Sequence, residues 1–114
     1  MQAFMLFSLF FIVYLAPDGS PQNATVTVLD SRRVEFEWLP PSTEEVNGVI
    51  IGFIIRVAGQ DSDEVVELQT NETKIIMERL HPFYSYLFTV AARTEVGTGP
   101  FSSTISFQLP TAGE

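Results

Sequence analysis

The chain has 114 residues, which suggests a single domain, and it has no cysteine, which excludes a disulfide framework and a cysteine-ligated metal site. Its 14 acidic and 6 basic residues give a net charge of −8. Because an acidic surface repels anionic groups, this charge argues against binding to nucleic acid, heparin or an anionic membrane.

Residues 1–16 form a hydrophobic leader with no charged side chain. The apolar run over 3–16 is short for a membrane span but has the length of a signal-peptide core. Two features depart from the usual signal. No Lys or Arg precedes the run. Cleavage after Ala16 would place the bulky Tyr14 three residues before the cleaved bond and Pro17 directly after it, and neither fits the preference for small residues at a cleavage site. We therefore expect either a signal peptide or an uncleaved signal anchor, with an alternative start of a longer transcript as a third explanation.

A polar, turn-rich stretch over 17–22 is expected to link this leader to a domain over 23–110, and a C-terminal linker is expected over 111–114. Asn23 and Asn71 each begin an N-x-T sequon and are predicted N-glycosylation sites. Two sequons behind a hydrophobic leader indicate an extracellular protein, either secreted or held at the cell surface.

Alternating apolar and polar residues predict the first two strands, over 25–29 and 34–38. In the second strand Val34, Phe36 and Trp38 alternate with glutamates, so the apolar side chains should face a core and the carboxylates should face solvent. The two prolines that follow are expected to end this strand, because proline cannot continue a central ladder.

Three further strands are predicted over 49–57, 65–69 and 74–77, with polar turns between them. Phe53, Ile55 and Val57 fall on one face of the first of these. The carboxylates Asp61 and Glu64 belong to a charged turn.

The strongest single pattern is L-x-P-x-x-x-Y, from Leu80 to Tyr86. This spacing matches a tyrosine corner, in which a buried phenol hydrogen-bonds to the backbone upstream of its own strand. Tyr86, Phe88 and Val90 share one face of a strand predicted over 86–92. A glycine-rich loop and a last strand over 105–109 should complete the domain.

The order W-x-P-P, N-G-x-I-x-G-F, L-x-P-x-x-x-Y and G-x-G-P resembles the fibronectin type III (FN3) domain over nearly all of 20–110. The resemblance implies an all-β fold, a seven-stranded antiparallel immunoglobulin-like β-sandwich. The strands over 25–29, 34–38 and 74–77 would form one sheet and the other four strands the second. The expected core consists of Val34, Phe36, Trp38, Ile55, Val57, Leu80, Tyr86, Phe88, Val90 and Ile105.

We expect no catalytic residues, no metal and no cofactor. The only histidine, His81, lies in the corner at a position that is variable and exposed in FN3 domains. The turn with Asp61, Asp63 and Glu64 is interpreted as solvated, because calcium takes about six to eight oxygen ligands and this run offers few. The sequence also lacks the familiar hydrolase, P-loop and zincin motifs.

The loop over 93–101 is the candidate partner-binding site, with Arg93, Glu95, Val96 and Phe101 as its contact residues. The alternative is that Val96 and Phe101 pack on the base of their own loop. The Arg-Gly-Asp motif that integrin-binding FN3 domains can carry here is absent.

The resemblance implies a non-catalytic extracellular module that binds an unidentified protein partner or acts as a spacer in a cell-adhesion or receptor ectodomain. Neighbouring FN3 domains are expected in a longer parent, and contact with the membrane only through the leader or that parent. Two alternatives stay open. The chain is similar to repeats of receptor-type tyrosine phosphatases, so it would be a fragment without the catalytic domain. It would otherwise be a complete small secreted ligand or decoy.

Overall fold

The computed structural model describes residues 16–42, 46 and 48–112, so the expected leader lies outside the described residues except for Ala16. The described part contains eight strands: β1 (Gln22–Val28), β2 (Val34–Leu39), β3 (Gly52–Gly59), β4 (Val65–Thr70), β5 (Lys74–Met77), β6 (Ser85–Arg93), β7 (Thr98–Phe101) and β8 (Ile105–Gln108). Within these residues no helix is both long and apolar enough to cross a membrane.

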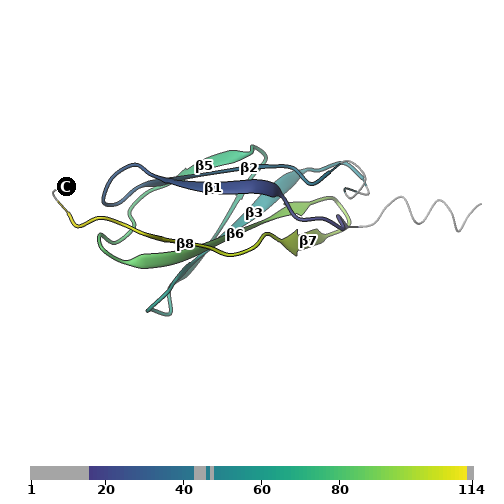
Figure 1. The fold of residues 1–114 in the computed structure, drawn as a ribbon. Coiled ribbons are helices and arrows are strands. Elements are labelled where there is room, and N and C mark those ends of the chain that lie inside the picture. Colours follow the sequence, from purple (N-terminus) through teal and green to yellow (C-terminus); the bar gives the residue numbers. More distant parts are fainter. Residues whose placement is uncertain (1–15, 43–45, 47, 113–114) are drawn as a thin grey trace, which may run out of the picture.

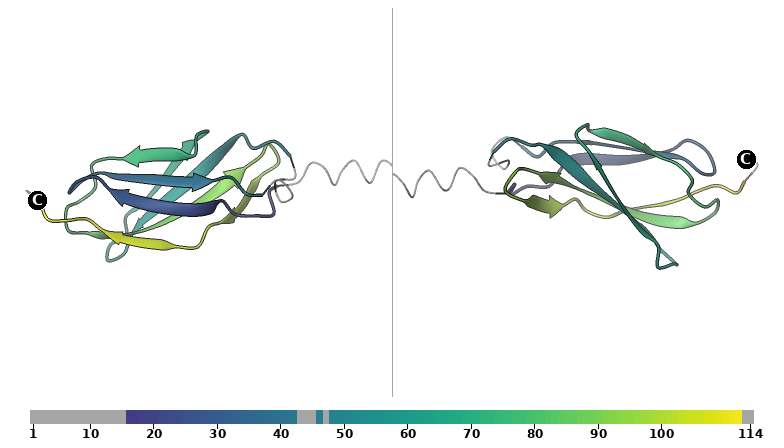
Figure 2. Two further views of the ribbon diagram at one scale, coloured as in Figure 1. Left: turned by 45° about the horizontal axis from the view of Figure 1, so that its top comes forward. Right: turned by 180° about the vertical axis from the view of Figure 1, so that it is seen from behind.

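The strands form two antiparallel sheets that pack face to face (Figure 1). One sheet has the order β1-β2-β5, and the other has the order β4-β3-β6-β7, with β8 also paired to β6. The predicted β-sandwich and the division of its strands between the two sheets are therefore confirmed. Two further views show that the hairpin between β3 and β4 extends beyond the body of the sandwich (Figure 2).

The last strand is divided, which the sequence did not predict. β7 pairs with the end of β6 and β8 with its beginning, so the described residues form eight strands where seven were expected. At the break, the Val90 backbone N–H donates to the Ser102 hydroxyl (3.1 Å), and the Ser102 N–H donates to the Val90 carbonyl (2.8 Å). Because a side-chain oxygen takes the place of a backbone acceptor, the ladder is interrupted there while the donors stay satisfied.

The core lies between the sheets and contains nine of the ten predicted residues: Val34, Phe36, Trp38, Ile55, Val57, Leu80, Tyr86, Phe88 and Val90. The prediction for Ile105 was wrong, since this residue is only partly buried and packs against the core from its margin, at the start of β8. Phe53, Met77 and Leu109 are buried as well.

Aromatic rings join the two sheets. The rings of Phe36 in β2 and Phe88 in β6 stack with centroids 4.2 Å apart, and Trp38 meets the edge of Phe53 at 5.6 Å. Such pairs contribute about 0.5–1.5 kcal/mol beyond the area that they bury.

The expected linker over 17–22 packs on the domain. Pro17, Gly19 and Pro21 are buried, and β1 already begins at Gln22. A Cβ atom built on Gly99 of β7 would come within 2.8 Å of Pro17. Pro17 therefore runs closely along β7, and glycine is the residue that leaves room for it.

Candidate functional site

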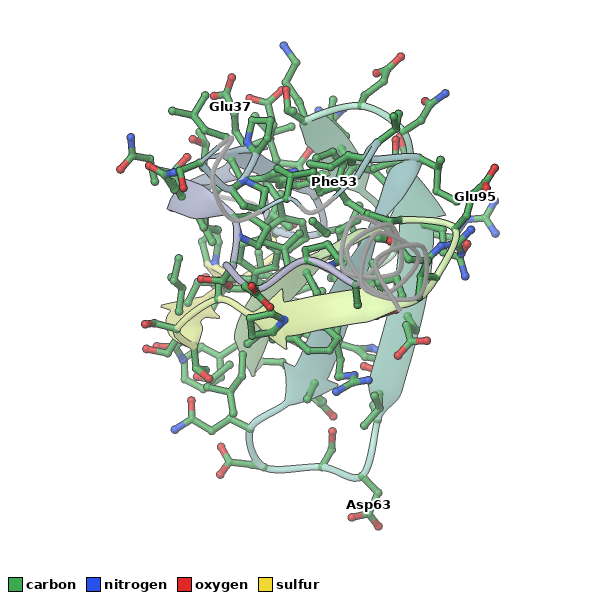
Figure 3. The ribbon with its side chains drawn as sticks, turned by 90° about the vertical axis from the view of Figure 1, so that its right-hand side faces the viewer. Glu37, Phe53, Asp63 and Glu95 are labelled. Carbon is green, nitrogen blue, oxygen red and sulfur yellow. The ribbon has the colours of Figure 1, made fainter. Side chains whose placement is uncertain are left out.

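The start of β3, the end of β6 and the turns beside them lie at one end of the sandwich. Gly52 pairs with Arg93, and Phe53 pairs with Thr70 at the end of β4. Figure 3 looks onto this end: Glu95 lies at the rim and points outward, whereas Phe53 lies inside the sandwich. We call this surface the loop pole and define it by Val49, Ile51, Asn71, Arg93, Glu95 and Val96.

The turn between β6 and β7 is tighter than the loop expected over 93–101. The Thr94 N–H donates to the Gly97 carbonyl (3.0 Å), and the Val96 N–H donates to the Thr94 hydroxyl (3.3 Å). These bonds hold the chain in a short reverse turn, with Glu95 and Val96 at its tip. Val96 is 56% exposed, so it does not pack on the base of its own loop.

Two more apolar side chains accompany Val96 at the loop pole. Val49 is 78% exposed and Ile51 is 40% exposed, and the Ile51 N–H donates to the Arg93 carbonyl (2.9 Å). Sequence reasoning missed both because it assigned 49–57 to one strand, whereas β3 begins at Gly52. Val49-Ile50-Ile51 did carry a signal, since successive residues of a strand cannot all face the same core.

A shallow hollow of about 230 Å³ lies beside these residues and is lined in part by Gln69, Asn71 and Arg93. The Arg93 Nη1 donates to Gln69 Oε1 at 3.0 Å, which holds the guanidinium over the ends of β4 and β6. The loop pole thus combines exposed apolar area with an arginine, a residue type that is enriched at protein interfaces.

The placement of Phe101 in the binding loop was wrong. Phe101 belongs to β7 and is partly buried, with the Arg56 guanidinium 4.4 Å from the centre of its ring. Arg56 in turn forms an ion pair with Glu67 (2.9 Å). Sheet pairing to β6 draws Phe101 out of the loop and onto the outer face of the larger sheet.

Both predicted glycosylation sites are exposed: Asn71 belongs to the loop pole, and Asn23 lies in the strand that begins near it. Asn71 lies in the turn between β4 and β5. Asn23 lies in β1 beside an irregularity of the β1–β2 register and has a φ of 52°, a left-handed conformation that asparagine adopts more readily than most residues. The side chain at each position is open to solvent.

His81 and the acidic turn after β3 lie away from the loop pole. His81 is exposed, with its Nε2 3.8 Å from Glu64 and its ring 4.9 Å from that of Tyr84. Asp63 lies at the tip of the β3–β4 hairpin, away from the body (Figure 3). Among the described residues, no group of three or more His, Asp or Glu side chains is placed to hold a metal ion.

A family model described as the fibronectin type III domain matches residues 19–108. The tyrosine-protein phosphatase Lar of Drosophila melanogaster is 36% identical over 92 residues, which cover 78% of this chain and 4% of that protein. The human netrin receptor DCC is 34% identical over 95 residues, which cover 82% of this chain and 7% of that protein. The chain therefore spans only a small part of the length of these relatives.

Solved structures of FN3 domains agree with the family match. The chicken CNTN1 FN1–FN3 domains superpose with a TM-score of 0.76 at 25% identity, over 85% of this chain and 33% of that one. The FN5 domain of Drosophila Lar superposes with a TM-score of 0.70 at 26% identity, over 85% of this chain and 100% of that one.

Proposed function

The chain belongs to the fibronectin type III family, and we propose that it is a non-catalytic extracellular module whose loop pole binds a protein partner. The observation that carries the proposal is the exposure of Val49, Ile51 and Val96 together at one end of the sandwich. Loops on a rigid scaffold often carry recognition, because the scaffold holds them in place before the partner arrives. The clustered aliphatic side chains supply apolar area that a partner can bury, and the Arg93 guanidinium beside them can donate hydrogen bonds.

We propose further that the module stands next to other FN3 domains in a longer parent protein. The support is the length of its relatives: the matched region is only 7% of the human netrin receptor DCC and 5% of the human receptor-type tyrosine-protein phosphatase F. In such a parent, enzymatic activity would belong to a different domain, and this module would bind or act as a spacer without a cofactor.

The extracellular assignment rests on the hydrophobic leader over 1–16 and on the sequons at Asn23 and Asn71. The side chains of Asn23 and Asn71 are exposed and therefore accessible to glycosylation. The leader would act as a signal peptide or as an anchor that keeps the domain at the membrane surface.

Expression in secretory mammalian cells tests this part of the proposal. The intact mass of the protein from medium and membranes, measured with and without glycosidase, should show glycans that disappear in the variant with both Asn23→Gln and Asn71→Gln. An unglycosylated protein that starts at Met1 and stays inside the cell would refute the extracellular assignment. A glycosylated protein recovered only from the medium would favour the alternative of a small secreted ligand or decoy over a membrane-held module.

Binding at the loop pole is tested with multimers of the glycosylated domain, which are screened against cells that express a library of surface proteins. A partner found in this way should lose affinity by about tenfold or more for Val96→Asp, because the substitution places a charge in an apolar contact. Val65→Asp is the matched control, since Val65 is 61% exposed in β4 and lies away from the loop pole. Equal loss in both variants would exclude the loop pole as the binding site.

A further inference from the structure

A second surface hollow, of about 400 Å³, lies between the β1–β2 turn and the end of β5. Its lining consists of Asp30, Ser31, Arg32, Arg33, Glu78 and Arg79, and we call it the arginine hollow. The chain has only 6 basic residues and a net charge of −8, so this hollow collects three of its six cationic side chains in one place. A cationic site on an acidic domain is a place where an anionic ligand meets attraction rather than repulsion.

The backbone builds this hollow in advance of any ligand. The Leu80 N–H donates to the Arg32 carbonyl (3.0 Å), which joins the β1–β2 turn to the segment that follows β5. The Asp30 carboxylate accepts hydrogen bonds from the backbone N–H groups of Arg32 (2.8 Å) and Arg33 (2.9 Å). Arg79 has a φ of 63°, a left-handed conformation that is costly for a residue other than glycine. The geometry is therefore fixed by bonds within the turn and across to its neighbour.

The charges of the hollow are only partly compensated. Arg33 is engaged by Asp30, with its Nε 2.7 Å from Oδ2. Among the residues that the structure describes, Arg32 and Arg79 form no ion pair, and both are exposed. Glu78 also lines the hollow and reduces its net positive charge. Two guanidinium groups thus remain open, and a guanidinium binds a carboxylate through two parallel hydrogen bonds.

Apolar side chains border the same turn. Val28 and Leu29 are each 41% exposed, and the Leu29 N–H donates to the Arg33 carbonyl (2.9 Å). Arginine is enriched at protein interfaces, and Val28 and Leu29 add apolar area beside it. A dense polyanion fits less well, because Asp30 and Glu78 repel it and the domain as a whole is acidic.

From these observations we infer that the arginine hollow binds a protein segment that presents two carboxylates beside an aliphatic side chain. The carboxylates pair with Arg32 and Arg79, and the aliphatic group lies against Val28 or Leu29. The β1–β2 turn lies at the end of the sandwich opposite β7 and the loop pole (Figure 1), so this surface is separate from the one that carries the proposed function.

The test uses the whole glycosylated protein and a fluorescein-labelled peptide with two glutamates flanking a leucine, and reads fluorescence anisotropy. A twin peptide with glutamines in place of the glutamates should bind at least about tenfold more weakly. The double variant Arg32→Gln, Arg79→Gln should lose the preference for the glutamate peptide. Arg56→Gln, which removes an exposed arginine on the other sheet, should leave it unchanged.

The single variant Arg32→Gln separates a loss of binding from a loss of folding. The Arg32 side chain is exposed and forms no ion pair among the described residues, so this variant should bind the glutamate peptide more weakly while its urea midpoint stays the same. Equal affinity for both peptides, no binding at millimolar peptide, or full binding by the double variant would overturn the inference. Heparin that displaces the peptide and binds more tightly would also overturn it in favour of a polyanion. Val96→Asp should leave peptide binding unchanged, so failure here and failure at the loop pole are distinguishable.

Discussion

The phenol oxygen of Tyr86 accepts a hydrogen bond from the backbone N–H of His81 at a distance of 3.0 Å. Tyr86 is almost fully buried in β6, and His81 lies in the corner that leads into that strand. Burial raises the pKa of the Tyr86 phenol further above neutral pH, which favours the protonated hydroxyl. This bond confirms the predicted tyrosine corner and ties the segment after β5 to the strand at the centre of the larger sheet.

Tyr86→Phe should lower the free energy of unfolding by about 1–3 kcal/mol, because the His81 N–H loses its acceptor in a partly buried position. Urea denaturation followed by tryptophan fluorescence measures the change. Tyr84→Phe is the matched control and should change the midpoint little, since Tyr84 is 50% exposed. Equal effects of the two substitutions would mean that the corner bond does not stabilise the domain.

Trp38→Ala should cost about 3–5 kcal/mol, because the side chain is fully buried between the sheets and packs on Phe53 and Phe88. This is a large share of the stability of a small domain, so the variant should be largely unfolded by circular dichroism at moderate temperature. Leu39→Ala changes the next residue, which is 51% exposed, and should keep the parent melting curve. A folded Trp38→Ala variant with a parent-like midpoint would contradict the assigned core.

Phe83→Gly should be more stable than Phe83→Ala by about 1 kcal/mol. Phe83 has a φ of 68°, a conformation that strains alanine but not glycine. Because Phe83 is 63% exposed, both variants lose little buried area, and the difference between them reports the backbone conformation. The Phe83 N–H donates to the Pro110 carbonyl (3.1 Å), which holds this conformation in place. Equal urea midpoints for the two variants would show that the backbone conformation at this position is not strained.

Acid should weaken the β1–β2 turn through Asp30. Hydrogen bonds from the backbone N–H of Arg32 and from the side chain of Arg33 lower the pKa of this carboxyl below its usual 3.8. A group whose pKa is lower in the folded state stabilises the fold above its unfolded pKa and loses that contribution as the pH falls through the folded value. Stability measured against pH should therefore fall less steeply below the usual pKa in Asp30→Asn than in the parent. Parallel curves for the two proteins would refute this role.

Much of the fold follows from patterns that are local in the sequence. Val34, Phe36 and Trp38 alternate with glutamates, and this period of two already assigns them to the inner face of a strand. The strand predicted over 74–77 has the same bounds as β5. The Leu80 to Tyr86 spacing identified the corner because its bond joins residues that are close in the chain.

The candidate site was predicted only in part. Arg93, Glu95 and Val96 lie at the loop pole, but Phe101 is drawn into β7, and Val49 and Ile51 were assigned to a strand that in fact begins at Gly52. The errors share a cause. Where a strand starts or breaks depends on which residue of the partner strand lies opposite, and this register is set by contacts far along the chain.

Side-chain alternation and turn spacing act over a few residues, so they were enough to predict the β-sandwich, most of the residues that face its core and the tyrosine corner. The break of the last strand at Ser102 and the position of Val49 and Val96 at one end of the molecule depend instead on contacts between segments far apart in the chain. Arg32 and Arg79 come together in the same way, since the pairing of β2 with β5 and the backbone bond from Leu80 to Arg32 join two segments that are distant in sequence.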